Sequence, residues 1–220
     1  MKLIKLLLFT QLDPKQIKIQ ELMRSKDMNI ITVLGPAGTG KTTVTCSEAV
    51  RQFNNKEIEK IVLTRPTVGV SGENLGFLPG DLEEKMLPWC RPLMDVLTEY
   101  YPQSRIKQLL DNSNIEISPL SYMRGRTFKK SIVILDEAQN TTPEQMKMFL
   151  TRIGEESKLV LTGDLDQSDI EKTNGLQDFV NRLKCHYSDN YYKMYVDGFA
   201  TVRMTKIYRH PIIEKVIELY

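Results

Sequence analysis

Short, mostly apolar runs alternate with segments of helical period along this chain. Five such runs are rich in β-branched side chains and span residues 30–34, 61–64, 115–118, 132–135 and 159–162. Strands of this composition are usually buried on both faces, which is typical of a parallel sheet covered by helices on each side. The pattern therefore predicts an α/β fold with a mainly parallel sheet.

Three segments have the spacing of an amphipathic helix, at residues 42–53, 143–152 and 212–220. In the second segment, Met146, Phe149 and Leu150 fall at positions i, i+3 and i+4, so they share one face that can be buried. Thr142 can cap the start of this helix, and Pro143 suits its first turn. We expect helices to follow the strands at these places.

One long segment interrupts the alternation. Residues 65–92 contain four prolines and four glycines together with apolar residues such as Val68, Leu75 and Phe77. A loop of this length inside a compact domain is usually either functional or disordered. Because its apolar content argues against disorder, we expect a functional loop.

Composition narrows the class of protein. The chain has 220 residues, which fits a single domain over 1–220, and 41% hydrophobic residues exclude a disordered chain. The net charge of +2 excludes a polycation that binds nucleic acid through its overall field. Three cysteines without a CxxC pair argue against a disulfide framework or a cysteine zinc site.

The location of the protein is inferred from the same composition. No apolar run approaches the ~18 residues that a membrane span needs, and residues 1–11 are interpreted as an edge segment because their apolar run is short. Few cysteines favour a reducing compartment. We therefore expect a cytoplasmic protein with no membrane partner.

A glycine-rich loop follows the first predicted strand. It reads GPAGTGKT at residues 35–42 and connects a strand to a helix, the context that a phosphate-binding loop requires. Its backbone N–H groups can surround phosphate oxygens at a helix N-terminus. The Lys41 ammonium can bind the β- and γ-phosphates, and the Thr42 hydroxyl can ligate Mg²⁺. The predicted nucleotide-binding residues are Gly35, Pro36, Ala37, Gly38, Thr39, Gly40, Lys41, Thr42 and Thr43.

Two acids, Asp136 and Glu137, directly follow the apolar run at 132–135. They would lie at the carboxyl end of a buried strand, where open α/β sheets bind ligands. Asp136 can hold Mg²⁺ with Thr42, and Glu137 can polarise the water that attacks the γ-phosphate. The pair predicts hydrolysis of ATP with Mg²⁺. Two solvated acids at a helix start are the alternative interpretation of the pair alone.

Two glutamines extend the predicted site. Gln167 ends the sequence GDLDQ after the run at 159–162, and its amide can sense the γ-phosphate or orient the attacking water. Gln16 precedes the phosphate loop by one predicted helix, and a glutamine amide can pair with the edge of adenine. A simple turn at GDLDQ and a solvated surface glutamine at position 16 are the alternatives.

These motifs, in this order, resemble the ATPase cores of superfamily 1 helicases. The segments at 65–68, 72–85, 122–127, 136–152 and 209–211 further resemble the PhoH family of ATPases, and the likeness covers about residues 12–220. The resemblance implies a single RecA-like P-loop NTPase domain, ATP binding and hydrolysis, work on RNA, and assembly into a ring.

Four residues are candidates for contact with nucleic acid. Residues 122–130 combine four basic side chains, two aromatics and a glycine, a mixture that suits contact with phosphates and stacking on bases. This segment contributes Tyr122, Arg124 and Arg126, and Arg65 can contact phosphate or nucleic acid from the end of a predicted strand. Single-stranded RNA is the expected partner and DNA the alternative, while a basic loop that only solvates the protein remains open.

Three other functions remain open. A P-loop kinase would share the phosphate loop, but Asp136, Glu137 and the GDLDQ sequence favour hydrolysis. A nucleotide-gated RNA-binding module would bind nucleotide without turnover. A ribonuclease associated with the ATPase would need a separate nuclease motif, which the sequence does not offer.

The expected assembly follows from the resemblance to superfamily 1 helicases, which place ATP between two RecA-like lobes. The second lobe supplies an arginine to the γ-phosphate, and this sequence predicts one lobe. An arginine supplied by a neighbouring subunit can add about 10³–10⁵ to the rate, so we expect a closed homo-oligomeric ring, a hexamer. Arg209 is the expected donor, with Arg124 and Arg126 as alternatives.

Overall fold

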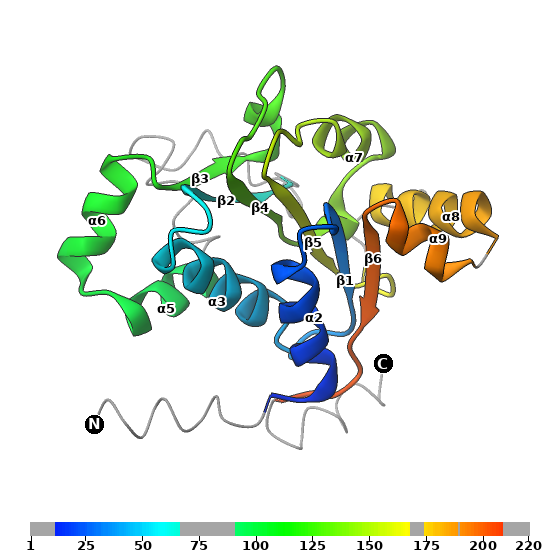
Figure 1. Ribbon diagram of the computed structural model, residues 1–220, viewed down its shortest axis with the longest axis horizontal. Coiled ribbons are helices and arrows are strands. Elements are labelled where there is room, and N and C mark those ends of the chain that lie inside the picture. The colour runs from blue at the N-terminus through cyan, green and yellow to red at the C-terminus, as the bar shows by residue number, and fades with distance from the viewer. Residues whose placement is uncertain (1–11, 67–90, 168–173, 189, 209–220) are drawn as a thin grey trace.

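The computed structural model describes residues 12–66, 91–167, 174–188 and 190–208. Its centre is a six-stranded, wholly parallel sheet with the strand order β3-β2-β4-β5-β1-β6 (Figure 1). The strands are β1 (Ile30–Leu34), β2 (Lys60–Arg65), β3 (Ile115–Pro119), β4 (Ser131–Leu135), β5 (Lys158–Gly163) and β6 (Phe199–Arg203). The parallel sheet confirms the predicted α/β fold class.

Helices cover both faces of this sheet. They are α2 (Pro14–Arg24), α3 (Lys41–Asn54), α5 (Arg91–Tyr100), α6 (Gln103–Asp111), α7 (Pro143–Leu150), α8 (Gly175–Tyr187) and α9 (Tyr191–Val196), with short 3₁₀ turns at η3 (Leu120–Met123) and η4 (Ala138–Asn140). Figure 1 shows α2, α3 and α5 on one side of the strands and α7 and α8 on the other. Within the described ranges, no helix has both the length and the apolar composition needed to cross a membrane.

Alternate residues of each strand face the two helical layers. In β1, Ile31 and Val33 pack in the core that includes α2 and α3, whereas Ile30 and Leu34 pack in the core that includes α7 and α8. This period of two explains why the strands are apolar at successive positions.

The apolar pattern locates five strands and misses β6. In this edge strand Ala200 and Val202 are buried, while Thr201 and Arg203 are exposed. Alternation over only five residues is a weak signal. The helix predicted at 143–152 is α7, which ends at Leu150. Residues 1–11, the helix predicted at 212–220 and most of the loop at 65–92 lie outside the described residues.

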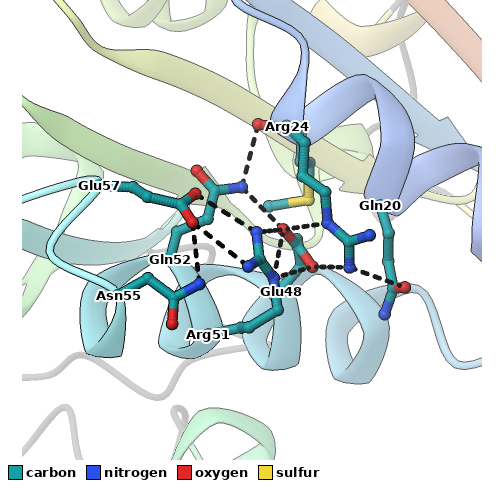
Figure 2. Close-up of polar contacts among 8 residues, drawn as sticks. Gln20, Arg24, Glu48, Arg51, Gln52, Asn55 and Glu57 are labelled. Carbon is teal, nitrogen blue, oxygen red and sulfur yellow. Dashed lines mark hydrogen bonds and ion pairs between the residues drawn. The ribbon is translucent and has the colours of Figure 1, made fainter.

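A buried carboxylate fixes α2 against α3 (Figure 2). Glu48 of α3 has a side chain with 0% exposure and accepts hydrogen bonds from Arg24 of α2 at 3.0 and 2.8 Å. Arg51 also donates to Glu48, and the Gln52 amide bridges Glu48 to the Met23 carbonyl oxygen. Burial raises the pKa of the Glu48 carboxyl, but the hydrogen bonds from Arg51 and Arg24 outweigh burial and lower it. The charged carboxylate therefore holds the two helices together.

Candidate active site

The phosphate loop lies at the carboxyl end of β1 and leads directly into α3. Its entry is fixed because the Gly35 N–H donates to the Gly163 carbonyl oxygen of β5 at 3.1 Å. Gly35 has a φ of +151°, and a Cβ there would lie 2.4 Å from the Met204 carbonyl oxygen. Gly40, with a φ of +80°, precedes the first helical residue. The glycines are therefore required by backbone conformation and by the close approach of the segment after β6.

Lys41 is the first residue of α3 and folds back over the loop. Its ammonium donates to the carbonyl oxygens of Gly35 at 2.6 Å and Pro36 at 2.9 Å. The Thr39 hydroxyl donates to the same Pro36 oxygen at 2.9 Å. A cation beside the N-terminus of α3, where backbone N–H groups point outward, is an arrangement that attracts phosphate.

Asp136 lies at the end of β4 and is almost completely buried, at 2% exposure. Its Oδ1 accepts hydrogen bonds from the hydroxyls of Thr42 at 2.8 Å and Thr162 at 2.5 Å. Its Oδ2 accepts two from the Arg65 guanidinium, at 3.0 and 2.5 Å. These bonds and the neighbouring cation compensate the burial of a negative charge. Elements β2, α3 and β5 thus each contribute a partner to one carboxylate.

These oxygens suit a magnesium ion that also binds nucleotide phosphate. Thr42 and Asp136 offer a hydroxyl and a carboxylate 2.8 Å apart, and Mg²⁺ is usually held by one or two carboxylates with phosphate oxygens and waters. Within the described residues, no three acidic, histidine or cysteine side chains gather to hold a metal by themselves. The donor set therefore fits a cation that enters together with a nucleotide.

Glu137 adopts a left-handed backbone conformation, with φ +54° and ψ +43°. For a residue other than glycine this costs about 1–3 kcal/mol, and such strain gathers at functional sites. The carboxylate accepts a hydrogen bond from the Gln139 amide at 2.7 Å and lies 3.5 Å from the Arg65 guanidinium. Its side chain is 47% exposed, so water can reach it.

Gln139 connects Glu137 with the segment after β5. Its amide oxygen accepts the Asp164 N–H at 3.1 Å, and buried Asp164 in turn accepts the N–H of Asp166 at 3.1 Å. These bonds orient residues 164–167 at the carboxyl edge of the sheet. Gln167 is exposed there, and its role as a γ-phosphate sensor stays a prediction.

Helix α2 carries Gln16 to the phosphate loop. Asp13 caps this helix by accepting the Gln16 N–H at 3.0 Å, and the Gln16 amide oxygen accepts the Asp13 N–H at 3.2 Å. The amide nitrogen of Gln16 lies 3.4 Å from the position that a Cβ on Gly40 would take. The predicted adenine-pairing residue is therefore beside the loop, and its reciprocal capping bonds fix it there.

Tyr208 closes the same corner and was not predicted. Its N–H donates to the Gly38 carbonyl oxygen at 2.9 Å, and its hydroxyl donates to the Asp13 carboxylate at 2.5 Å. Partial burial and this hydrogen bond raise the pKa of Tyr208 to about 12, so the phenol keeps its proton at neutral pH. In the sequence the only signal for Tyr208 is its position directly before Arg209, which itself lies outside the described residues.

Most of the chain matches one known family. The family model described as PhoH-like protein covers residues 10–220. The chain belongs to the PhoH-like family. A PhoH-like protein of Bacillus subtilis (strain 168) is 46% identical over 199 residues, which is 89% of this chain and 59% of the relative. Protein PhoH of Escherichia coli (strain K12) is 40% identical over 171 residues, which is 76% of this chain and 48% of the relative. The PhoH-like chain thus spans about half the length of the curated relatives it matches.

The PhoH-like chain also shares its fold with a solved ATPase core. The SWI2/SNF2 ATPase core of Sulfolobus solfataricus, in complex with double-stranded DNA, matches with a TM-score of 0.51 and 18% identity over 91% of this chain and 45% of that one. Identity this low shows the fold alone. The match confirms the predicted RecA-like P-loop architecture.

Two arginines that were predicted to contact nucleic acid form ion pairs within this PhoH-like protein. Arg65 is paired with Asp136 at 2.5 Å, so it lies beside the phosphate loop as expected, and its contact with phosphate or nucleic acid stays a prediction. Arg126 forms a bidentate ion pair with Glu116 and lies over the Phe128 ring, 4.7 Å from its centroid. The charge of Arg126 is therefore already balanced within the chain.

The other two predicted nucleic-acid residues stay on the surface. Tyr122 lies in η3, and Arg124 follows that turn; both are exposed. Their position allows contact with a strand, and their role stays a prediction.

Proposed function

We propose that this chain is a cytoplasmic, Mg²⁺-dependent ATPase that couples hydrolysis to the binding, translocation or remodelling of single-stranded RNA, with DNA as the alternative. The 2.8 Å contact between Thr42 and Asp136 carries the proposal. Thr42 and Asp136 are suited to hold Mg²⁺, and each is next in sequence to another proposed site residue, Lys41 of the phosphate loop or Glu137, the candidate base. ATP hydrolysis needs ligands for the metal cation, hydrogen-bond donors to the phosphate oxygens, and a base that accepts a proton from water.

Each of these side chains has its own task. The loop N–H groups and Lys41 bind the β- and γ-phosphates, and Lys41 exchanges two loop carbonyl oxygens for phosphate oxygens. Thr42 and Asp136 hold Mg²⁺, which when bound neutralises charge on those oxygens. An electron pair of the attacking water forms the new bond to the γ-phosphorus. The bond to the β–γ bridging oxygen breaks, and ADP leaves with its electrons. Glu137 accepts the proton of the water.

Arg65 responds to nucleotide in this proposal. Its guanidinium occupies one oxygen of Asp136 and lies 3.5 Å from Glu137. If Asp136 held a cation, the Arg65 guanidinium would be able to pair with Glu137 or with phosphate. Arg65 therefore connects the occupancy of the site with the end of β2.

Three further residues complete the site. Gln16 pairs with adenine, Gln167 senses the γ-phosphate, and Arg209 reaches the nucleotide of a neighbouring subunit in a closed hexameric ring. The position of Gln16 beside Gly40 supports the first assignment. The steep rate gain from an arginine supplied in trans supports the last.

The decisive experiment measures phosphate release from ATP with and without single-stranded RNA or DNA. Lys41→Ala should lower kcat at least about 100-fold, because it removes charge that stabilises the transition state. Lys107→Ala, an exposed lysine of α6, is the matched control and should keep wild-type turnover. Full turnover by the Lys41→Ala protein would overturn the site.

The same assay separates the other functions. A kinase would form a phosphorylated acceptor instead of free phosphate. A nucleotide-gated module would bind nucleotide with turnover no higher than that of Glu137→Gln. A ribonuclease would shorten the RNA, which a gel would show.

A further inference from the structure

A groove of about 390 Å³ lies between α8, α9 and the carboxyl ends of β1 and β6. Its floor is apolar, and its walls and rim carry aromatic and cationic side chains. The residues that matter most are Leu34, Tyr187, Tyr191, Lys184 and Arg203. Leu34 and Arg203 also line a smaller cavity that contains Gly35 and Pro36. The groove is therefore a neighbour of the phosphate loop.

Its aromatic wall is suited to a planar ligand. Tyr187 is buried and forms part of the wall, while Tyr191 begins α9 and is 66% exposed. An exposed ring beside an apolar hollow offers a stacking face to a planar group, and nucleobases stack on tyrosine without regard to sequence.

The charges around the groove favour phosphate. Lys184 of α8 and Arg203 of β6 take part in no salt bridge within the part of the chain that the structure describes. Burial and the neighbouring Asp197 carboxylate raise the pKa of the Tyr187 hydroxyl, and Asp197 does not line the groove. The lining of the groove therefore combines two cations and two tyrosines with no acidic side chain among the described residues.

A larger cavity illustrates the contrast. It measures about 670 Å³ and lies at the amino ends of the same strands, beside Ile30 and Phe199. Its lining contains two acids, Glu144 and Asp178, beside two cations, Lys147 and Arg182, and Arg182 is paired with Asp178 at 2.7 Å. The groove near the phosphate loop is therefore distinguished by its charges rather than by its size.

We propose that this groove binds one unstacked base of a single-stranded nucleic acid. Tyr191 stacks on the base, and Lys184 and Arg203 contact the flanking phosphates. The inference deepens the proposed function and rests on it for the nucleic-acid partner. Because Leu34 and Arg203 border both the groove and the phosphate-loop cavity, the strand lies where a change at the nucleotide can reach it.

Fluorescence anisotropy of a labelled 12-nucleotide single strand on the full chain tests the stacking contact. Tyr191→Ala should weaken binding roughly 5- to 100-fold, whereas Tyr191→Phe, which keeps the ring, should restore most of it. Tyr192→Ala is the matched control, because Tyr192 is 79% exposed on the same helix and does not line the groove. It should bind as the wild type does.

The salt dependence of binding tests the phosphate contacts. Lys184→Gln should reduce the slope of log affinity against log salt concentration by about 0.7 if it removes one phosphate contact. Lys107→Gln makes the same charge change on α6, at the other end of the sheet (Figure 1), and should leave the slope unchanged.

The outcomes are distinguishable. Wild type and Tyr191→Ala could bind the nucleic-acid strand equally well while the strand still stimulates ATP turnover. That result would overturn the proposal that the groove binds a base, and it would leave the proposed function standing. A wild-type protein that hydrolyses ATP but binds no single-stranded nucleic acid would overturn both the proposal that the groove binds a base and the nucleic-acid part of the proposed function. A mononucleotide that binds the groove as tightly as the strand, or a Tyr191→Ala variant that changes only oligomeric mass, would assign the groove to another ligand.

Discussion

Asp136 is a buried carboxylate that a neighbouring cation neutralises. In this structure its two oxygens are shared by Thr42, Thr162 and Arg65, so the charge is neutralised by a guanidinium. A buried carboxylate without a cation would be strongly destabilising. A metal ion bound with nucleotide would take over this neutralisation, so the carboxylate would be paired with a cation in both states.

Glu137→Gln tests the proposed base. The amide keeps the shape of the side chain but cannot accept a proton from water, so ATP turnover should fall about 100-fold or more while nucleotide affinity stays within a few-fold of wild type. Measuring phosphate release and nucleotide binding on the same preparation checks the predicted loss of turnover and the predicted retention of affinity. Gln139→Glu is unsuitable as a control because Gln139 bonds both Glu137 and Asp164. Glu144→Gln, at the start of α7, should retain turnover. Unchanged turnover in Glu137→Gln would move the base elsewhere.

Among the strands, those that face the core on two sides were the ones that the sequence revealed. The run at residues 132–135 is buried at every position of β4, so its composition alone predicts a strand. Strand β6 shows one buried face over five residues, and helix α6 follows Pro102 without a side-chain cap that would mark its start. Short elements with weak local signals depend on tertiary packing, which a single sequence does not display.

The same contrast holds for the site. The phosphate loop and the pair Asp136–Glu137 are each contiguous in sequence, so their chemistry can be predicted from consecutive residues. The bond between Tyr208 and Asp13 joins residues 195 positions apart, and the contact of Arg65 with Asp136 spans 71. Such contacts exist only after the sheet has formed.

Glu48 makes the link between α2 and α3 dependent on pH. Its pKa is lowered in the folded chain from an ordinary value of 4.5, so the stabilisation is fully present above that value and is lost as pH falls through the folded pKa. Glu48→Gln should lower the free energy of unfolding by about 2–3 kcal/mol at pH 7. The difference from wild type should shrink below about pH 4.5.

Urea unfolding at several pH values measures this difference. Glu57→Gln is the matched control, because Glu57 also pairs with Arg51 but its side chain is 43% exposed and its bonds are 3.3 Å long. An exposed pair contributes about 0–1 kcal/mol. Equal effects of the two substitutions would show that the buried carboxylate is not what fixes the helices.

At the scale of the whole molecule, the candidate site residues and the groove lie along the carboxyl edge of one sheet. The phosphate loop follows β1, Arg65 ends β2, the two acids follow β4, and the groove lies at the ends of β1 and β6. Ligands of open parallel sheets bind at this edge. Nucleotide and strand would therefore share the ends of the same strands, which is the arrangement needed for one to influence the other.

A ring would complete this edge with a neighbouring subunit, and mixed variants test it. Lys41→Ala and Arg209→Ala proteins should each be nearly inactive, because one lacks the phosphate-loop charge and the other the arginine supplied to its neighbour. In an equimolar mixture, about one quarter of the interfaces of a randomly assembled ring pair an intact Lys41 with an intact Arg209. ATP turnover should therefore recover to roughly that fraction of wild type. A mixture of Lys41→Ala with Glu137→Gln should recover no activity. Lys41 and Glu137 of one site come from the same subunit, so every site in this mixture lacks one of the two, although Arg209 is intact in both proteins. Light scattering with nucleotide present gives the mass, and a monomeric mass with no recovery in the first mixture would contradict the ring.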